Sequence, residues 1–214
     1  MHVQLPEPIM ADEPHVVLHD VSWAFYEALS RECDDRPIRI NYANGVLEIM
    51  TISTEHEGYK EAIGHLIAAV SSDLGIDIAS RGSATLKLEG KEKALEADQC
   101  YWVAHEAVIR GVRRLDLAVH PPPDIVVEID ITHAVVDRGS IYAAIGVPEM
   151  WHFDKKTGLT AWERSGTEWA RVEAAKSFPM IRVSELNPFI ERWWTDGQRA
   201  VLASFRDWLR SLPR

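Results

Sequence analysis

Two acidic residues, Glu128 and Asp130, interrupt a segment that otherwise has the pattern of a buried β-strand, DIVVEIDI over residues 124–131. The segment is apolar on both faces and rich in β-branched residues, as is typical of a central strand in a covered sheet. Residues two apart share one face of a strand, roughly 6.6–6.8 Å apart along it. Because a charged carboxylate in a dry core is costly unless it is paired or metal-bound, these acids need a partner or an open strand end. Alternatively, Asp130 merely ends the strand.

A second acidic motif, Glu96-Ala97-Asp98, stands at the head of another expected strand, residues 99–103. An acid in this place is often only a turn residue. Beside Glu128, however, Asp98 can provide the second carboxylate for a shared Mg²⁺ ion, which prefers hard oxygen ligands and keeps several waters. Mn²⁺ is an alternative ion for such a site. An ion held there would lower the pKa of a bound water and stabilise charge on a phosphate.

Ahead of these acids, the sequence predicts a short helix and a β-hairpin. Asp20 is expected to cap a helix over residues 21–31. Residues 38–40 and 46–50 alternate in polarity around Asn44-Gly45, and an Asn-Gly pair in this setting is the strongest short hairpin signal.

Thr54 and Glu57 have the spacing of a capping box and predict the start of a long helix, residues 55–74. Gly75 is expected to end it. Apolar residues at helical spacing give this helix a buried stripe. His56 shares that stripe, so it either contacts the acidic site or is a hydrogen-bonded core histidine.

After the acidic strand, the chain is expected to form a helix over residues 136–145 and a strand over residues 149–153. Residues 159–163 and 167–172 predict an antiparallel edge of the sheet. Asp196 is expected to cap a C-terminal amphipathic helix. This order predicts an α/β or α+β fold, a mixed β-sheet flanked by helices.

The composition is that of a globular protein, with 46% hydrophobic and 26% charged residues among 214, which excludes a disordered or fibrous chain. Residues 1–14 are expected to be an N-terminal arm and residues 15–214 a single domain. The sequence has no apolar run of membrane-spanning length, no secretory signal and only two cysteines, so we expect a cytoplasmic protein without membrane partners. The net charge of −10 argues against broad electrostatic binding of nucleic acid. It does not exclude a nuclease, because the carboxylates of a metal site add to the negative charge and bound divalent ions offset part of it.

The acids belong to a longer series of motifs that resembles a known family. Asp98, followed by Glu128 and Asp130 on consecutive expected strands, is similar to the PD-(D/E)XK nuclease core. More closely, the chain resembles the Uma family of restriction-endonuclease-like proteins over about residues 38–154. The matching motifs are Gly45-x-Leu47-Glu48-x-Met50, Ser53-Thr54-Glu55-His56-Glu57, Leu95-Glu96-Ala97-Asp98, PPDIVVEID at 122–130 and IYAAIGVPEMW at 141–151. The last motif is the most specific.

The resemblance implies a restriction-endonuclease-like fold and a metal-dependent phosphodiesterase site, with Asp98 and Glu128 as the metal-binding acids. His56 would approach this site from the long helix. The chain departs from the pattern at Asp130, where the superfamily has lysine, and at Ala97, where proline is usual. The resemblance implies that Arg138 supplies the basic group instead, at a position where lysine is common. Arginine can orient a phosphate, but it stays protonated and cannot act as a base.

Together these features predict a Mg²⁺-dependent DNA endonuclease, with Asp98 and Glu128 holding the ion and Arg138 contacting the phosphate. The departures at Asp130 and Arg138, and the acidic charge, favour an alternative: a catalytically silent nucleic-acid-binding or regulatory protein on the same fold. A third hypothesis is a metal-dependent hydrolase of a small phosphate ester. Glu128→Ala is expected to abolish Mg²⁺-dependent cleavage and leave the fold intact. Because alanine removes the strain of an unpaired buried acid, stability without metal should hold or rise.

DNA is the expected partner, and a homodimer is expected because two antiparallel sites are needed to cut both strands. Five aromatic residues near the C-terminus could form an association surface: Phe189, Trp193, Trp194, Phe205 and Trp208. The alternative is a monomer with all five in its own core. Trp162, Trp169 and Trp193-Trp194 could also stack on bases, although packing against the sheet edge explains them better.

Overall fold

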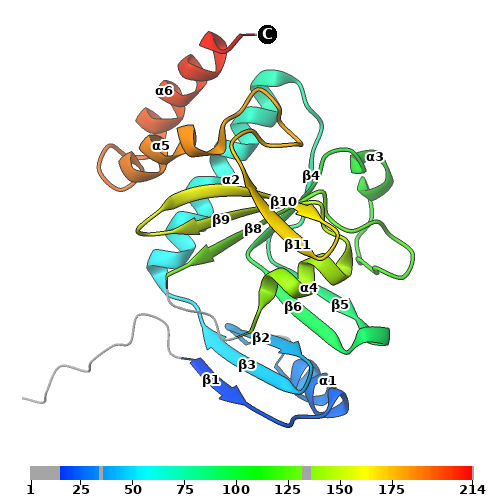
Figure 1. Cartoon of the computed structure of the whole chain (residues 1–214). Coiled ribbons are helices and arrows are strands. Elements are labelled where there is room, and N and C mark those ends of the chain that lie inside the picture. Colours follow the sequence, from blue (N-terminus) through cyan, green and yellow to red (C-terminus); the bar gives the residue numbers. More distant parts are fainter. Residues whose placement is uncertain (1–14, 34–35, 132–135, 214) are drawn as a thin grey trace, which may run out of the picture.

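The strands form two β-sheets, one at the lower end of the molecule and one across its middle (Figure 1). This computed structural model describes residues 15–33, 36–131 and 136–213. Within them, sheet A has the order β1-β3-β2-β6-β5 and is antiparallel throughout. Sheet B has the order β11-β10-β9-β8-β7-β4 and pairs β8 with β9 in parallel. The strands are β1 His15–Leu18, β2 Ile38–Ala43, β3 Val46–Thr51, β4 Ala79–Ser80, β5 Ala84–Leu88, β6 Lys93–Ala97, β7 Gln99–Trp102, β8 Ile125–Asp130, β9 Glu149–Asp154, β10 Gly158–Ser165 and β11 Glu168–Val172.

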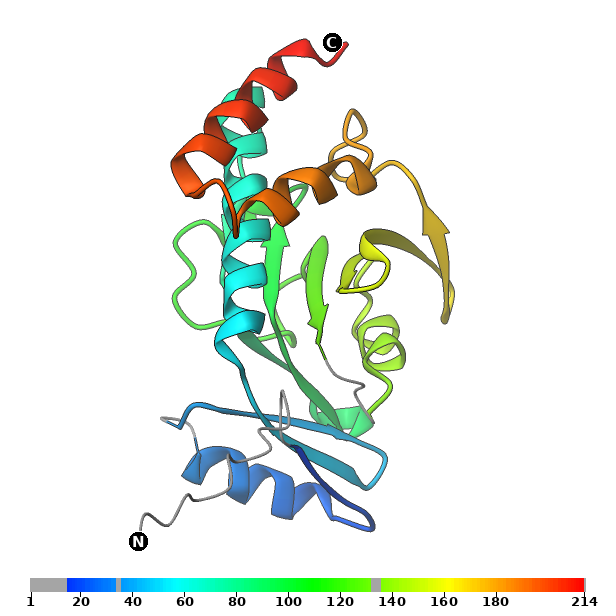
Figure 2. The ribbon, with the colours of Figure 1, turned by 90° about the vertical axis from the view of Figure 1, so that its left-hand side faces the viewer.

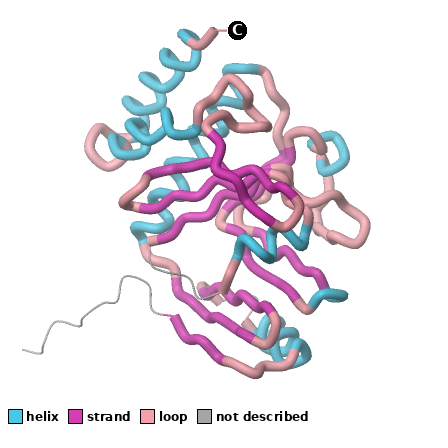
Figure 3. Tube along the Cα trace, viewed as in Figure 1, coloured by secondary structure: helices cyan, strands magenta, loops and turns pink. Residues whose placement is uncertain are grey.

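Helices pack on both sheets. The helix α1 packs on sheet A, whereas α2 and the C-terminal helices α5 and α6 cover one face of sheet B. Figure 2 shows α2 running upward from sheet A to lie beside α6. The helices are α1 Trp23–Glu32, α2 Thr54–Leu74, α3 Glu106–Ile109, α4 Arg138–Ile145, α5 Asn187–Arg192 and α6 Gln198–Ser211, with 3₁₀ turns η1 Glu89–Lys91 and η2 Val183–Leu186. Figure 3 shows the strands between α6 at the upper left and α1 at the lower right.

The predicted hairpin is confirmed as β2 and β3. Asn44 and Gly45 have φ values of 51° and 82°, the positive values that a two-residue hairpin turn of this type requires. Ile40 and Tyr42 of β2 pack in the cluster with α1. Because side chains alternate along a strand, Arg39 points to the opposite face, away from α1.

The long helix α2 begins one residue earlier than predicted. Ser53, not Thr54, is its N-cap, and the Ser53 side chain accepts the backbone N–H of His56 at 3.0 Å. The predicted capping box of Thr54 and Glu57 is therefore wrong. Gly75 ends the helix as predicted, with φ 67°. This start fixes His56 in the first turn of α2.

The two other predicted caps are also displaced. Helix α1 is capped by Ser22 rather than Asp20, which has φ 57°. Helix α6 starts after Gly197, and Asp196 instead accepts a hydrogen bond from Arg192 at 2.7 Å. Both helices are present, but α1 begins two residues later and ends one residue later than the predicted range of 21–31.

Asp98 lies where the chain leaves sheet A and enters sheet B. Strand β6 ends at Ala97, and β7 begins at Gln99. Strand β8 lies between β7 and β9, so the acidic segment is the central strand that the sequence predicts. Asp98 thus lies at the junction of the sheets directly before β7, and Glu128 lies on β8, the strand that pairs with β7.

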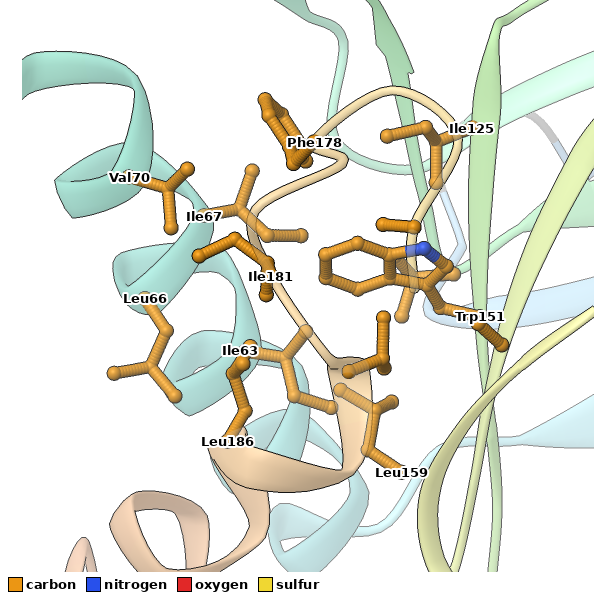
Figure 4. Close-up of a cluster of buried hydrophobic side chains, with 14 of the residues drawn as sticks. Ile63, Leu66, Ile67, Val70, Ile125, Trp151, Leu159, Phe178, Ile181 and Leu186 are labelled. Atoms are coloured by element: carbon orange, nitrogen blue, oxygen red, sulfur yellow. The ribbon is translucent and has the colours of Figure 1, made fainter. Parts of the chain in front are cut away.

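Alternate residues of β8 divide the core in two. Ile125, Val127 and Ile129 face α2 and the C-terminal helices in the cluster that Figure 4 shows in part. Val126 and Glu128 point to the other face, where Val126 packs with residues of α4. The acidic face of sheet B is therefore the one that α4 covers.

The C-terminal aromatics give little support to a dimer surface. Phe205 is fully buried and Trp193 is 8% exposed, while Phe189 and Trp208 pack partly buried against the core. Trp194 alone of the five is half exposed, at 51%. The homodimer stays a prediction. Light scattering tests it by comparing the mass in solution with the mass of one chain, 24.2 kDa.

The α+β architecture, with a mixed sheet flanked by helices, confirms the predicted fold class. The strands are divided between two sheets, which the sequence did not reveal. Among the described residues, no helix is both long and apolar enough to cross a lipid bilayer. The expected N-terminal arm, residues 1–14, lies outside the described residues.

Candidate active site

Asp98 is fully buried and is contacted from three elements. Its Oδ2 accepts the backbone N–H of Ile129 in β8 at 2.7 Å. Its Oδ1 lies 3.1 Å from Nε2 of His56 in α2 and forms an ion pair with Arg39 of β2. Although these two groups lie against it, Oδ1 has no hydrogen bond of good geometry within the described residues. We therefore regard its contact with Arg39 as an ion pair.

Asp98 lies close to Glu128. Strands β7 and β8 pair Gln99 with Val127, so Asp98 directly precedes the residue that faces the chain neighbour of Glu128. The Asp98 carboxylate also accepts the backbone N–H of Ile129, the residue after Glu128. Burial lowers the pKa of Arg39, and the charge of Glu128 is the largest influence opposing that shift. Both acids thus act within one electrostatic cluster.

Glu128, 2% exposed, is paired with two residues of α4. Arg138 donates to its Oε2 and the Tyr142 hydroxyl donates to its Oε1. These donors are four residues apart and so lie on the same face of the helix. Burial raises the pKa of Tyr142 well above its ordinary value, so its hydroxyl keeps the donating proton.

This pairing corrects the expectation that alanine at Glu128 would leave metal-free stability unchanged or higher. That expectation assumed an unpaired acid. Because Arg138 is only 7% exposed, losing Glu128 would leave a buried guanidinium without its partner, which is strongly destabilising.

Asp130 links Arg138 to β9. Nε2 of His152 lies 2.7 Å from Asp130 Oδ2, and Nη1 of Arg138 lies 3.7 Å from Oδ1. Burial alone would raise the pKa of Asp130, but the hydrogen bond with His152 and the charge of Arg138 outweigh it and lower that pKa. The same hydrogen bond raises the pKa of His152. Asp130 therefore does more than end the strand.

The hairpin of sheet A contributes a polar face to the site. Asn41 Nδ2 donates to Glu48 Oε2 at 3.2 Å, and the backbone N–H of Glu96 donates to Asn41 Oδ1 at 3.2 Å. Met50 Sδ accepts from Nη2 of Arg138 at 3.1 Å. Sheet A thus contacts the residues of sheet B and α4 directly.

The centre of the cluster sets three carboxylates, from Asp98, Glu128 and Asp130, against the guanidinium groups of Arg39 and Arg138. His56 adds no positive charge at neutral pH. Burial lowers its pKa to about 4, and the charge of Arg39 acts in the same direction. A neutral His56 can donate Nε2–H toward Asp98.

His56 is expected to make the fold acid-sensitive. Its pKa is about 4 in the fold against about 6.5 in an unfolded chain. Between these values the unfolded chain binds more protons, so this contribution to stability is present above pH 6.5 and is lost as the pH falls toward 4. The loss between pH 7 and pH 5 should be roughly 2 kcal/mol.

The variant His56→Gln keeps an amide N–H donor and should not show this loss. Urea unfolding of both proteins in EDTA at the two pH values measures the difference. Equal pH dependence in the variant and the wild type would show that His56 is not the responsible group.

All five residues that the sequence analysis proposed for the site lie in this cluster: Asp98, Glu128, Asp130, Arg138 and His56. The pairing of Arg39 with Asp98 and the contacts of Tyr142 and His152 were not predicted from the sequence. One sequence signal could have indicated Arg39. It shares a face of β2 with Asn41, and Asn41 pairs with Glu48 of β3. Such polar residues at alternate positions are usually taken for a solvated face.

The donor set fits a hard divalent cation. Asp98, before β7, and Glu128, on β8, both offer carboxylate oxygens. Asp98 Oδ1 is a buried oxygen without a well-directed hydrogen bond in the described structure. Mg²⁺ is commonly bound by one or two carboxylates and several waters. Within residues 15–33, 36–131 and 136–213, no three His, Cys, Asp or Glu side chains are grouped to hold an ion. An ion would therefore rely on these two acids and compete with Arg39 and Arg138 for them.

Comparison with known families identifies the family of the chain. The Uma2 family, described as "Putative restriction endonuclease", matches residues 23–200, which include every residue of the cluster. Comparison with the curated proteins gives no match. Because the match covers most of the chain, from α1 to the start of α6, the chain belongs to the Uma2 family of restriction-endonuclease-like proteins.

Proposed function

We propose that the protein is a Mg²⁺-dependent endonuclease that hydrolyses phosphodiester bonds in DNA. The observation that carries this proposal is the buried pair of acids, Asp98 before β7 and Glu128 on the neighbouring β8, with two arginines against them. Carboxylates alone would repel a phosphodiester, and the combination of acids and guanidinium groups suits a site where a cation and a phosphate meet.

In this proposal, Asp98 and Glu128 hold Mg²⁺, and Mn²⁺ can replace it. When bound, the ion would supply Lewis acidity at the phosphate and lower the pKa of a water molecule. Arg138, released from Glu128, binds a phosphate oxygen and stabilises its charge. Neither Arg138 nor Arg39 serves as a base, because guanidinium stays protonated in proteins. His56 orients Asp98, and Asp130 positions Arg138 and His152.

Plasmid cleavage tests the proposal. Supercoiled DNA should be nicked or linearised by the wild type in Mg²⁺ or Mn²⁺ and remain intact in EDTA. Asp98→Asn should lose the activity. A matched control, Asp207→Asn, changes an acid that is 76% exposed on α6 and should cut like the wild type. Equal cleavage by all three proteins would point to a contaminating nuclease and contradict the proposal.

A second candidate function is a catalytically silent nucleic-acid-binding or regulatory protein. The observation that favours it is that each acid already has an arginine partner, so the cluster needs no metal to balance most of its charge. This candidate predicts DNA binding without cleavage and no change of thermal stability in Mg²⁺ or Mn²⁺. The endonuclease proposal predicts cleavage and a rise in thermal stability in either ion.

A further inference from the structure

A pocket of about 400 Å³ adjoins Glu128 and Asp130. This volume is within the range of small-ligand sites, about 300–1,000 Å³. Strand β8, helix α4 and the N-cap of that helix supply its carboxylates and its arginine, β9 supplies His152, and β10 and β11 supply two tryptophans, Trp162 and Trp169. The pocket therefore joins the acids of the proposed active site to an aromatic wall.

Strand register puts the acids and tryptophans on one face of sheet B. The relevant cross-strand pairs are Glu128 with His152, Met150 with Trp162, and Arg164 with Trp169. Paired residues share a face, as do residues two apart on one strand. Both tryptophans therefore lie on the face of Glu128, opposite the core packed by α2.

The indole N–H groups are already bonded within the chain. Trp162 donates to Thr160 Oγ1 at 3.1 Å, and Trp169 donates to the backbone oxygen of Gly139 at 3.0 Å. Both side chains are only partly buried and both line the pocket. The two rings can therefore contact a ligand through their apolar aromatic faces but have no free hydrogen-bond donor for it.

The charges of the pocket limit its ligand. Three carboxylates line it, from Glu128, Asp130 and Asp137, beside the guanidinium of Arg138 and the imidazole of His152. An anionic group is disfavoured against this wall, whereas a neutral flat ring that carries N–H donors matches both the acceptors and the aromatic surface. A nucleobase has these properties.

We propose that this pocket binds the base of an unpaired nucleotide in a DNA strand, beside the phosphodiester held at the acids. The inference rests on the proposed endonuclease function for its substrate class. A base within a duplex is paired and stacked, so it can enter such a pocket only from a single strand or after extrusion. The protein should accordingly prefer single-stranded or distorted DNA to a regular duplex.

Binding without metal tests the pocket separately from catalysis. Fluorescence anisotropy in EDTA at low salt would measure a labelled single-stranded oligonucleotide and the same strand annealed to its complement. The wild type should bind the single strand more tightly. Trp162→Leu and Trp169→Leu should each weaken single-strand binding about tenfold, a loss typical of one base–aromatic stack, and leave duplex binding unchanged.

Two further variants control for folding and for general tryptophan effects. Trp162→Phe keeps an aromatic ring and should retain most of the affinity. Trp194→Leu changes a tryptophan that is 51% exposed, contacts the α2 residue Tyr59 and does not line the pocket, so it should bind like the wild type. Thermal unfolding would verify that each variant is folded before its affinity is compared.

The proposal is overturned if the wild type binds no single strand, if both leucine variants bind it unchanged, or if Trp194→Leu loses as much affinity. Displacement of the strand by micromolar deoxyadenosine monophosphate would also overturn it, by making a free nucleotide the ligand. The two proposals fail separately. If the leucine variants bind the single strand more weakly but the wild type cleaves no DNA, only the endonuclease proposal is rejected. If the wild type cleaves DNA but the leucine variants bind the single strand as tightly as the wild type, only the pocket proposal is rejected.

Discussion

Glu128→Gln is expected to lower Mg²⁺-dependent DNA cleavage by about a hundredfold or more, the scale seen when one group that stabilises charge in a transition state is removed. The amide keeps nearly the size of the acid and can still accept the Tyr142 hydroxyl that now contacts Glu128. It lacks the charge that would hold a divalent ion with Asp98. Initial rates of plasmid nicking measure the effect.

The variant also leaves Arg138 without its buried partner, so lost activity could reflect lost structure. The double variant Glu128→Gln/Arg138→Met removes both charges and should recover much of the stability, because replacing a whole buried ion pair costs far less than breaking it. It should be folded and inactive. Wild-type cleavage by either variant would show that Glu128 is not part of the site.

Arg39→Met is expected to destabilise the fold by about 3–5 kcal/mol, the usual cost of leaving one partner of a buried ion pair alone. Arg39 is 1% exposed and Asp98 is fully buried, so water cannot solvate the abandoned carboxylate. Urea unfolding in EDTA measures the loss. Adding Asp98→Asn to the variant should restore most of it.

An exposed ion pair provides the matched control. Arg210 of α6 pairs with Asp207 at 2.8 Å, and the two side chains are 64% and 76% exposed. Because such an exposed pair is solvated and screened, Arg210→Met should leave the free energy of unfolding nearly unchanged. Similar losses for Arg39→Met and Arg210→Met would mean that the Arg39–Asp98 pair does not act as a buried ion pair.

The elements that the sequence predicts well are those with strong local signals. Asn44-Gly45 fixes the hairpin because both residues take positive φ, and the run of β-branched residues in β8 predicts a central strand. Helix starts are harder to place. Ser53 and Thr54 can both cap α2, and the choice depends on which backbone N–H the side chain reaches.

The sequence predicts the acidic residues of the site but not the residues with which they pair. Glu128 stands out because a charged residue in an apolar strand needs compensation. Arg39 has no such signal, since one cation in an alternating strand resembles a solvent-facing residue. Its contact with Asp98 exists because β2 and the junction of β6 and β7 meet in the fold. Local pattern cannot reveal a pairing of this kind.

Asp98 and Glu128 are proposed to hold one divalent ion together, in competition with the arginines. Crystals soaked in Mn²⁺, with data collected for an anomalous difference map, test this most directly. We expect one peak about 2 Å from a carboxylate oxygen of each acid, with Arg138 moved away from Glu128. A map without a peak there, and with both arginine–carboxylate pairs intact, would contradict it.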